Sequence, residues 1–427
     1  MDNIQFLYQH YTKAYKVSTD SRKIGKDAVF FALKGEHFDG NDFALQVAKD
    51  GIASLVVADR QDLPEHERIL KVDDTLKTLQ ELAKYHRQQM KAKVIGITGT
   101  NGKTTTKELI SAVLSRRYRL IHTEGNFNNH LGVPLTLLSI KPDTEIAVVE
   151  MGANHPGEID QLAHFACPDC GLITNIGKAH LEGFGSFQGV VNTKTELYRF
   201  IKEHGGFIFV NRDNSLLWQY AQDQKHVSYG SSDEADYRTT LADCAPYLCV
   251  EWNGHKAQTK LVGTYNFENA AAAIAVGRHF RVSDDDIHAA LEAYTPTNSR
   301  SQVVESGKNR IIMDAYNANP TSMQASIRNF INICRPEHLL ILGDMGELGE
   351  ASQTEHQTIL NLIDELHFNA AYLVGPNFGA LAKDPRWTTF KDVNELIQHL
   401  QSHPVEGRDI LVKGSHSVQL EKVLPLL

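Results

Sequence analysis

The stretch VIGITGTNGKTTT at residues 94–106 decides the fold: an apolar run typical of a buried strand breaks into a glycine turn and a lysine. Gly99 and Gly102 let the turn aim backbone N–H groups at an anion, and the helical pattern that follows adds the positive end of a helix. Because Ile97 stands five before Gly102, the spacing is shorter than in G-x-x-x-x-G-K-[ST]. A chance Gly-Lys-Thr lacks this strand-and-helix context. We therefore predict a phosphate loop with these nucleotide-binding residues: Gly99, Thr100, Asn101, Gly102, Lys103, Thr104 and Thr105.

The composition is typical of a globular chain, with 42% hydrophobic and 22% charged residues among 427 and no apolar stretch of membrane-spanning length. The first 16 residues lack a continuous apolar core, so we expect no secretory signal and a cytoplasmic protein. A net charge of -9 argues against general nucleic-acid binding. Five cysteines fit a reducing compartment, and Cys167 and Cys170 lack the second pair of a familiar zinc pattern.

The length favours two to four domains, and we predict three α/β domains. Residues 1–88 hold two short apolar runs and read as a small α/β domain. In residues 89–297, apolar strands such as 146–150 and 172–176 alternate with helical patterns, which predicts a mostly parallel sheet with substrates at its carboxyl edge. The alternation restarts in residues 298–427 and predicts a Rossmann-like doubly wound domain with strands at 311–313, 339–342, 372–374 and 410–412.

Several helix starts can be predicted from local signals. Helical patterns cover residues 75–90, 266–278 and a segment beginning at Ser283. Pro320 suits a first helical turn, and Ser352 with Glu355 has the spacing of a capping box. The junction at residues 295–301 is expected to act as a hinge.

Two side chains after strands of the middle domain are candidates for chemistry. Glu150 ends an apolar strand beside the phosphate loop, where a carboxylate could hold magnesium; a surface glutamate is the alternative. His180 follows another strand within glycine-rich sequence and could ligate a metal or contact the reacting group, although a lone histidine is usually structural.

The chain resembles the Mur ligase family over nearly its whole length. Four motifs occur in the family's order and spacing: GTNGKTTTKE at 99–108, TEGNFNNHLGVPLTLL at 123–138, EMGANHPGEI at 150–159 and NIGKAHLEGFGS at 175–186. Within the family, three further stretches resemble the ligases that act last in the cytoplasm: TDSR at 19–22, DAYNANPTSM at 314–323 and LGDMGELG at 342–349. The resemblance implies a UDP-binding first domain, a central ATPase domain and a third ligase domain.

The implied activity is ATP-dependent formation of an amide bond between a UDP-N-acetylmuramoyl-tripeptide and D-alanyl-D-alanine, through an acyl phosphate. The resemblance also implies ADP and phosphate as the other products and Mg²⁺ as a cofactor. We expect no membrane span and a monomer. Because phosphorylation turns a carboxylate oxygen into a leaving group, the protein's task is positioning and charge stabilisation.

The resemblance assigns residue roles. Lys103, His180 and Lys194 would be catalytic, and Lys194 would be carbamylated to become an anionic magnesium ligand; an exposed helix lysine is the alternative. Asn266, Asn269, Arg300, Asp314 and Asn317 would bind the nucleotide, although Asn266 could instead cap a helix. Relatives often carry Gly-Arg where this chain has Ser299-Arg300. The implied metal ligands are Thr104, Glu150, His180 and Lys194, and the implied substrate-binding residues are Ser21, Arg22, Lys34, Asn128 and Lys413.

Two alternatives stay open. A sibling ligase that adds the third residue, or a folate polyglutamate synthase, would share the phosphate loop and the lysine; the Asp-Asn-Pro-Arg signature of the residue-three ligases is not found here. A nucleotide-dependent switch that binds a partner protein would make no amide bond.

Overall fold

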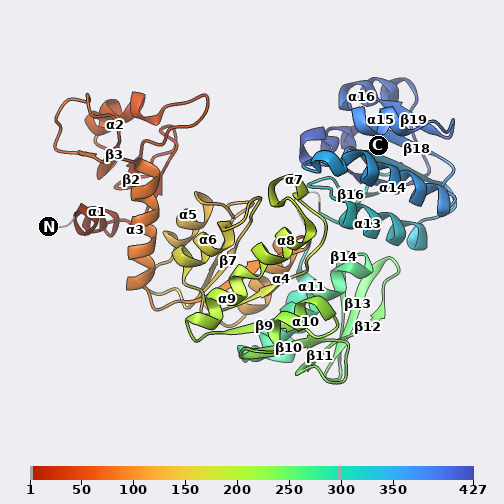
Figure 1. Cartoon of the computed structure of the whole chain (residues 1–427), viewed down its shortest axis with the longest axis horizontal. Coiled ribbons are helices and arrows are strands. Elements are labelled where there is room, and N and C mark those ends of the chain that lie inside the picture. The colour runs from red at the N-terminus through yellow and green to blue at the C-terminus, as the bar shows by residue number, and fades with distance from the viewer. Residues whose placement is uncertain (1–2, 297–299) are drawn as a thin grey trace.

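The computed structural model describes residues 3–296 and 300–427. Three α/β units follow one another along the long axis, from the N-terminal unit through a central unit to the C-terminal unit (Figure 1). In the described residues, no helix combines the length and the apolar character needed to cross a membrane. The predicted α/β class with parallel sheets is confirmed. The boundaries at residues 88 and 297 remain a proposal, and the second falls on residues 297–299, outside the described ones.

The N-terminal unit is a four-stranded parallel sheet in the order β1-β2-β3-β4. Its strands are β1 (Val17–Ser18), β2 (Val29–Phe31), β3 (Leu55–Ala58) and β4 (Ile69–Lys71), and its helices are α1 (Asn3–Tyr11), α2 (Ala44–Asp50) and α3 (Thr75–Gln89). Asp74 caps α3 by accepting a hydrogen bond from the Lys77 N–H at 2.8 Å.

Helix α3 joins this unit to the central one through a continuous apolar core. Leu79 and Leu82 on α3 are fully buried and belong to the same core as Val29 of the first sheet and Val149 of the central sheet. Polar bonds cross the same junction, since the Tyr11 hydroxyl donates to the Leu138 carbonyl at 2.6 Å. The two units are therefore packed together rather than tethered.

The central unit is built on a seven-stranded parallel sheet in the order β11-β10-β9-β8-β5-β7-β6. Its strands are β5 (Lys93–Thr98), β6 (Leu120–His122), β7 (Ile146–Glu150), β8 (Cys170–Ile173), β9 (Phe207–Asn211), β10 (His226–Gly230) and β11 (Tyr237–Arg238). Its helices are α4 (Lys103–Leu114), α5 (Gly132–Leu137), α6 (Glu158–Ala166), α7 (Leu181–Phe184), α8 (Phe187–Lys194), α9 (Glu196–Glu203), α10 (Ser215–Ala221), α11 (Phe267–His279) and α12 (Asp284–Ala293).

Both faces of the central sheet are covered. Along β5, Val94 belongs to the core that includes α6 and α9, whereas Ile95 and Ile97 belong to the core that includes α4 and α11. This alternation follows from the two-residue period of a strand. Strand β5, which leads into the phosphate loop, is thereby buried on both faces.

A small antiparallel sheet was not anticipated from the sequence. It consists of β12 (Thr240–Asp243), β13 (Tyr247–Trp252) and β14 (His255–Val262), which pair in that order before α11 (Figure 1). The outer strand β12 is mostly exposed, so its sequence carries little hydrophobic signal.

The C-terminal unit is a six-stranded sheet in the order β15-β16-β20-β17-β18-β19, parallel except for β15. Its strands are β15 (Gln302–Glu305), β16 (Arg310–Asp314), β17 (His338–Gly343), β18 (Ala371–Val374), β19 (Trp387–Phe390) and β20 (Asp409–Lys413). Its α-helices are α13 (Pro320–Ile333), α14 (Ser352–Glu365), α15 (Pro376–Leu381) and α16 (Val393–Ser402).

The helix-start predictions for this unit had mixed outcomes. Pro320 is the first residue of α13, as predicted, with Asn319 as its cap. The capping box at Ser352 is wrong, because the turn at Gly349–Ala351 runs directly into α14 and Ser352 is already helical. The Glu355 carboxylate instead accepts a hydrogen bond from the Lys178 ammonium of the central unit at 2.8 Å.

The packing of α11 on α4 predicts a steric limit at Gly277. A β-carbon there would lie 2.4 Å from Val113 Cγ1, so Gly277→Ala should lower the free energy of unfolding by about 1–3 kcal/mol despite alanine's better helix propensity. Gly379→Ala, in helix α15 with open space around it, should leave stability equal or higher. Thermal unfolding of both variants checks this, and equal melting temperatures would contradict the packing argument.

Candidate active site

The phosphate loop connects β5 to α4 through two glycines that no other residue can replace without displacement. Gly99 has φ +145° and a β-carbon there would lie 2.0 Å from Thr174 Oγ1. Gly102 has φ +77° and a β-carbon there would lie 2.4 Å from Asn269 Oδ1. Both conformations favour glycine, so backbone geometry and close packing together determine the loop sequence.

Two residues that follow β8 hold the loop in place. The Asn175 side chain accepts from the Asn101 N–H at 3.0 Å and donates to the Asn101 carbonyl at 3.1 Å. The Thr174 hydroxyl donates to the same carbonyl at 2.6 Å. Neither residue was predicted from the sequence as part of the site, although their place after the strand beside β5 was a usable signal.

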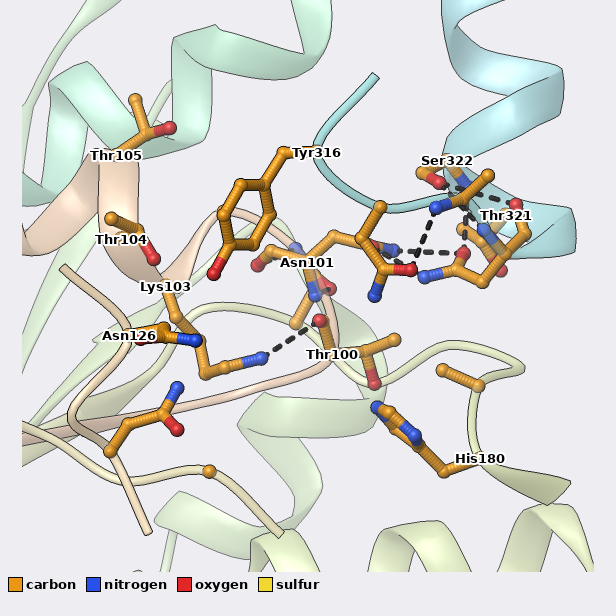
Figure 2. A pocket seen from close by; sticks show the side chains of 18 of the residues that line it. Thr100, Asn101, Lys103, Thr104, Thr105, Asn126, His180, Tyr316, Thr321 and Ser322 are labelled. Atoms are coloured by element: carbon orange, nitrogen blue, oxygen red, sulfur yellow. Dashed lines mark hydrogen bonds between the residues drawn. The ribbon is translucent and has the colours of Figure 1, made fainter. Parts of the chain in front are cut away.

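Lys103 begins α4 and folds back over the loop. Its ammonium donates to the Gly99 carbonyl at 2.8 Å and to the Thr100 carbonyl at 3.0 Å. Figure 2 shows the Lys103 side chain extending toward Thr100. Burial lowers the pKa of Lys103, with Glu150 opposing the shift and Arg300 adding to it. A phosphate bound at the loop could therefore take the place of the two neutral carbonyls as the hydrogen-bond acceptor of the Lys103 ammonium.

Glu150 presents a buried carboxylate oxygen with no partner. It is the last residue of β7 and pairs in register with Ile97 of β5, which places it beside the loop. Its Oε1 accepts from Asn128 Nδ2 at 2.8 Å, whereas its buried Oε2 has no hydrogen-bond partner among the described residues. Thr104, the first residue after Lys103, is also buried. Carboxylate and hydroxyl oxygens are the ligand types that Mg²⁺ prefers, so these residues fit the expected cation.

Lys194 is the last residue of α8 and is 1% exposed, so the alternative of a solvated helix lysine is wrong. Its Nζ lies 3.5 Å from the Ala153 carbonyl. Burial lowers its pKa to about 7, and Lys103 adds to this shift while Glu158 and Glu196 oppose it. A substantial fraction of this amine is therefore neutral, and hence nucleophilic, near pH 7.

His180 faces the C-terminal unit. It precedes α7 with φ +51° and its Nδ1 contacts the carboxylate of Glu347. The contact lowers the pKa of Glu347. His180 is thus placed at the junction of two units, at the edge of the same cavity as the loop (Figure 2).

Asn266 and Asn269 brace the helices behind the loop. Asn266 Nδ2 donates to the Val262 carbonyl at 2.8 Å, and its Oδ1 accepts from Asn269 Nδ2 at 2.9 Å. Asn269 Oδ1 accepts from the Thr106 hydroxyl of α4 at 2.9 Å. Asn266 stands at the N-cap position of α11, as the alternative predicted, but its side chain makes no capping bond there.

The C-terminal unit contributes a buried ion pair at its sheet edge. Asp314 and Lys413 end the neighbouring strands β16 and β20 in register, and Lys413 Nζ lies 2.6 Å from Asp314 Oδ2. The same ammonium donates to the Asn317 carbonyl at 3.3 Å, and Ser326 donates to Asp314 at 2.8 Å. The charge of Lys413 is therefore already partly neutralised.

Arg300 lies against Tyr316, with its guanidinium carbon 3.7 Å from the ring centroid. Its Nε is buried and has no hydrogen-bond partner among the described residues. Ser299, which departs from the family's glycine, lies outside the described residues. A buried donor beside the loop leaves Arg300 available to an anionic ligand.

One cavity of about 890 Å³ gathers most of the predicted residues from the central and C-terminal units. It is lined by Thr100, Asn101, Gly102, Lys103, Thr104, Thr105, Asn128, Glu150, His180, Asn266, Asn269, Arg300, Asp314, Asn317 and Lys413. Gly99 and Lys194 do not line it; Lys194 lies behind the wall formed by Ala153. In the described chain, no group of three or more histidine, cysteine, aspartate or glutamate side chains is placed to hold a metal.

Ser21, Arg22 and Lys34 are not brought into this cavity. They follow β1 and β2, whose parallel pairing puts them at one edge of the N-terminal sheet. The Arg22 side chain is 84% exposed and pairs with Asp20 at 2.9 Å. A substrate that touches both these residues and the loop would have to be long.

Comparisons with known proteins cover nearly the whole chain. Residues 13–87, 97–277 and 299–416 match models described as Mur ligase family catalytic domain, Mur ligase middle domain and Mur ligase glutamate ligase domain. The UDP-N-acetylmuramoyl-tripeptide--D-alanyl-D-alanine ligase of Bacillus subtilis is 36% identical, over 97% of this chain and 93% of that protein.

Two solved structures show the same architecture. A MurF structure from Acinetobacter baumannii superposes with a TM-score of 0.84 at 32% identity and covers 96% of this chain and 92% of its own. The MurF ligase from Thermotoga maritima in complex with ADP gives a TM-score of 0.84 at 27% identity and covers 96% of both chains.

The low pKa of Lys194 predicts how stability varies with pH. Between its folded value of about 7 and its ordinary value of 10.5, the unfolded chain binds a proton that the folded chain does not, so the lysine destabilises increasingly as pH falls through this window and no further below it. Lys194→Met should therefore stabilise the chain relative to the parent by more at pH 7 than at pH 9.5, approaching about 1.4 kcal/mol per pH unit.

Urea unfolding in CO₂-free buffer at both pH values measures this difference. The exposed Lys202→Met on α9 is the matched control and should leave the pH dependence of the parent unchanged. A stability difference for Lys194→Met that is the same at both pH values would contradict the assignment.

Proposed function

This chain belongs to the Mur ligase family, and from that premise we propose that it joins D-alanyl-D-alanine to a UDP-N-acetylmuramoyl-tripeptide with consumption of ATP. The product is the UDP-muramoyl-pentapeptide of peptidoglycan synthesis. The 36% identity to a ligase of this activity and the TM-score of 0.84 to a MurF structure, both over nearly the whole chain, support this member of the family over a sibling.

The observation that carries the proposal is the shared cavity. The phosphate loop with Lys103 and the partnerless Glu150 oxygen face the same space as Arg300 and the C-terminal sheet edge. A nucleotide switch needs only the first set, whereas a ligase must bring a phosphorylated acid and an amine together between two units. The arrangement therefore supports group transfer.

The residues perform that task by position and charge. The tripeptide carboxylate attacks the γ-phosphoryl group of ATP and ADP leaves; the dipeptide amine then attacks the acyl phosphate carbon and phosphate leaves. Lys103 and Arg300 supply positive charge beside the loop, where oxygens of the transferred phosphoryl group become crowded with negative charge. Asn266, Asn269, Asp314 and Asn317 would border the nucleotide.

Mg²⁺ would be held by Thr104, Glu150, His180 and a carbamylated Lys194. When bound, the ion neutralises charge on the phosphate oxygens. The buried Glu150 oxygen supports this assignment, and a carbamate on Lys194 would replace a buried cation beside Lys103 with an anion.

Substrate recognition would divide between the units. Ser21, Arg22 and Lys34 would bind the uridine diphosphate end at the N-terminal sheet edge, since an exposed arginine suits a diphosphate. Asn128 and Lys413 would contact the peptide parts near the loop. We further propose the domain division 1–88, 89–297 and 298–427, and a monomeric chain.

A substrate-dependence assay tests the activity. With ATP and the UDP-tripeptide present, adding D-alanyl-D-alanine should start ADP release together with a product heavier by the dipeptide. Lys103→Ala should lower the rate at least about 100-fold, because it removes charge from the loop, while the exposed Lys91→Ala should not. ATP hydrolysis that ignores the dipeptide would instead identify a nucleotide switch.

Carbamylation of Lys194 has its own test. Lys194→Ala should lower the rate at least about 100-fold, with partial rescue by added formate or acetate, because a short carboxylate can occupy the place of the carbamate. In the parent chain, ¹³C-bicarbonate should yield a carbamate NMR signal that Lys194→Ala lacks and Lys202→Ala keeps. Full activity of Lys194→Ala without added carboxylate would refute the role.

A further inference from the structure

A pair of asparagine side chains connects the phosphate loop directly to the C-terminal unit. Asn319 Nδ2 donates to Asn101 Oδ1 at 2.7 Å, and Asn101 Nδ2 donates to Asn319 Oδ1 at 3.5 Å. Asn101 lies at the tip of the loop between its two glycines, and both amides border the cavity. The contact therefore joins the loop to the neighbouring unit rather than to its own sheet.

Each member of the pair is held by its own unit. The Asn101 backbone is bracketed by Asn175, as described above. Asn319 caps α13, with its Oδ1 accepting from the Ser322 N–H at 2.9 Å and the Ser322 hydroxyl accepting from the Asn319 N–H at 3.1 Å. The Asn101 backbone and the Asn319 side chain are thus oriented independently of the pair, which reduces the conformational entropy lost when the pair forms.

The first turn of α13 also contacts the loop that follows β8. The Lys178 N–H donates to the Thr321 hydroxyl at 3.3 Å, and a β-carbon on Gly177 would lie 2.9 Å from Thr321 Oγ1 (Figure 2 shows Thr321 and Ser322 beside the cavity). One helical turn therefore lies against the two loops that follow the adjacent strands β5 and β8.

This junction differs in character from the N-terminal one. The N-terminal and central units share a continuous apolar core. The C-terminal core around Ile312 and Leu342 includes, among the described residues of the central unit, only Val262 and the partly buried Tyr247. The remaining contacts named here are polar, and water competes for such groups when they separate. Separating the C-terminal unit from the central one would therefore expose less apolar surface than separating the N-terminal unit.

We propose that Asn319 is a positioning residue that couples docking of the C-terminal unit to the phosphate loop through Asn101. The inference rests on the proposed function, because it assigns the nucleotide to this loop. With the unit docked, the amide pair holds the loop tip so that its N–H groups keep one arrangement for the phosphates. By linkage, a nucleotide that favours this arrangement also favours docking.

The test separates the amide pair from helix capping. Asn319→Ser keeps a good capping oxygen for α13 but is too short to reach Asn101, and Asn101→Ser removes the other partner. Each single variant should weaken binding of a fluorescent ADP analogue about three- to tenfold, the range of one neutral hydrogen bond, and raise the KM for ATP by a similar factor.

The double variant should be no worse than the weaker-binding single variant, because both changes remove the same contact. The melting temperature of Asn319→Ser should stay within about 2 °C of the parent. Gln357→Ala, which removes an exposed amide bond to Asn361 on α14, is the matched control and should leave nucleotide binding unchanged.

Multiplying effects in the double variant, or parent-like binding and KM in Asn319→Ser, would overturn the proposal. The analogue-binding arm needs neither the tripeptide nor the dipeptide. A parent chain that binds the nucleotide but forms no amide product would therefore sink the proposed function, while the binding cycle would still decide the role of Asn319.

Discussion

The arrangement of the phosphate loop depends on two hydrogen bonds between the Asn175 side chain and the Asn101 backbone. These two hydrogen bonds join the ends of adjacent parallel strands, so the loop geometry is set by the sheet register rather than by the loop alone. Gly99 can approach Thr174 only because it lacks a β-carbon. Loop, register and glycine positions therefore constrain one another.

A second constraint is the concentration of positive charge behind the loop. Lys103, Lys194 and Arg300 are buried or partly buried. The charge of Arg300 lowers the pKa of Lys103, and the charge of Lys103 lowers the pKa of Lys194. Glu150 opposes the shift at Lys103 but keeps one oxygen unsatisfied. Burying several cations close together costs free energy when no ligand is bound, and phosphate oxygens are the groups that would offset their charge.

The sequence was sufficient where a feature is local. The strand before Gly99, the carboxylate ending β7 and the proline opening α13 each carry a short-range signal, and the structure places them as predicted. It was insufficient where tertiary contacts decide. Ser352 became an interior helix residue, β12 shows little apolar pattern, the burial of Lys194 depends on packing, and Asn101 meets a partner 218 residues away.

The apolar core that runs through α3 has a consequence for how the chain folds. Because helix α3 contacts β2 of the first sheet and helices α5 and α6 of the central unit within one apolar core, neither unit has a complete interior without this helix. The two units should therefore melt as one cooperative block, and a chain cut after residue 88 would leave both fragments with bare hydrophobic surface that invites aggregation.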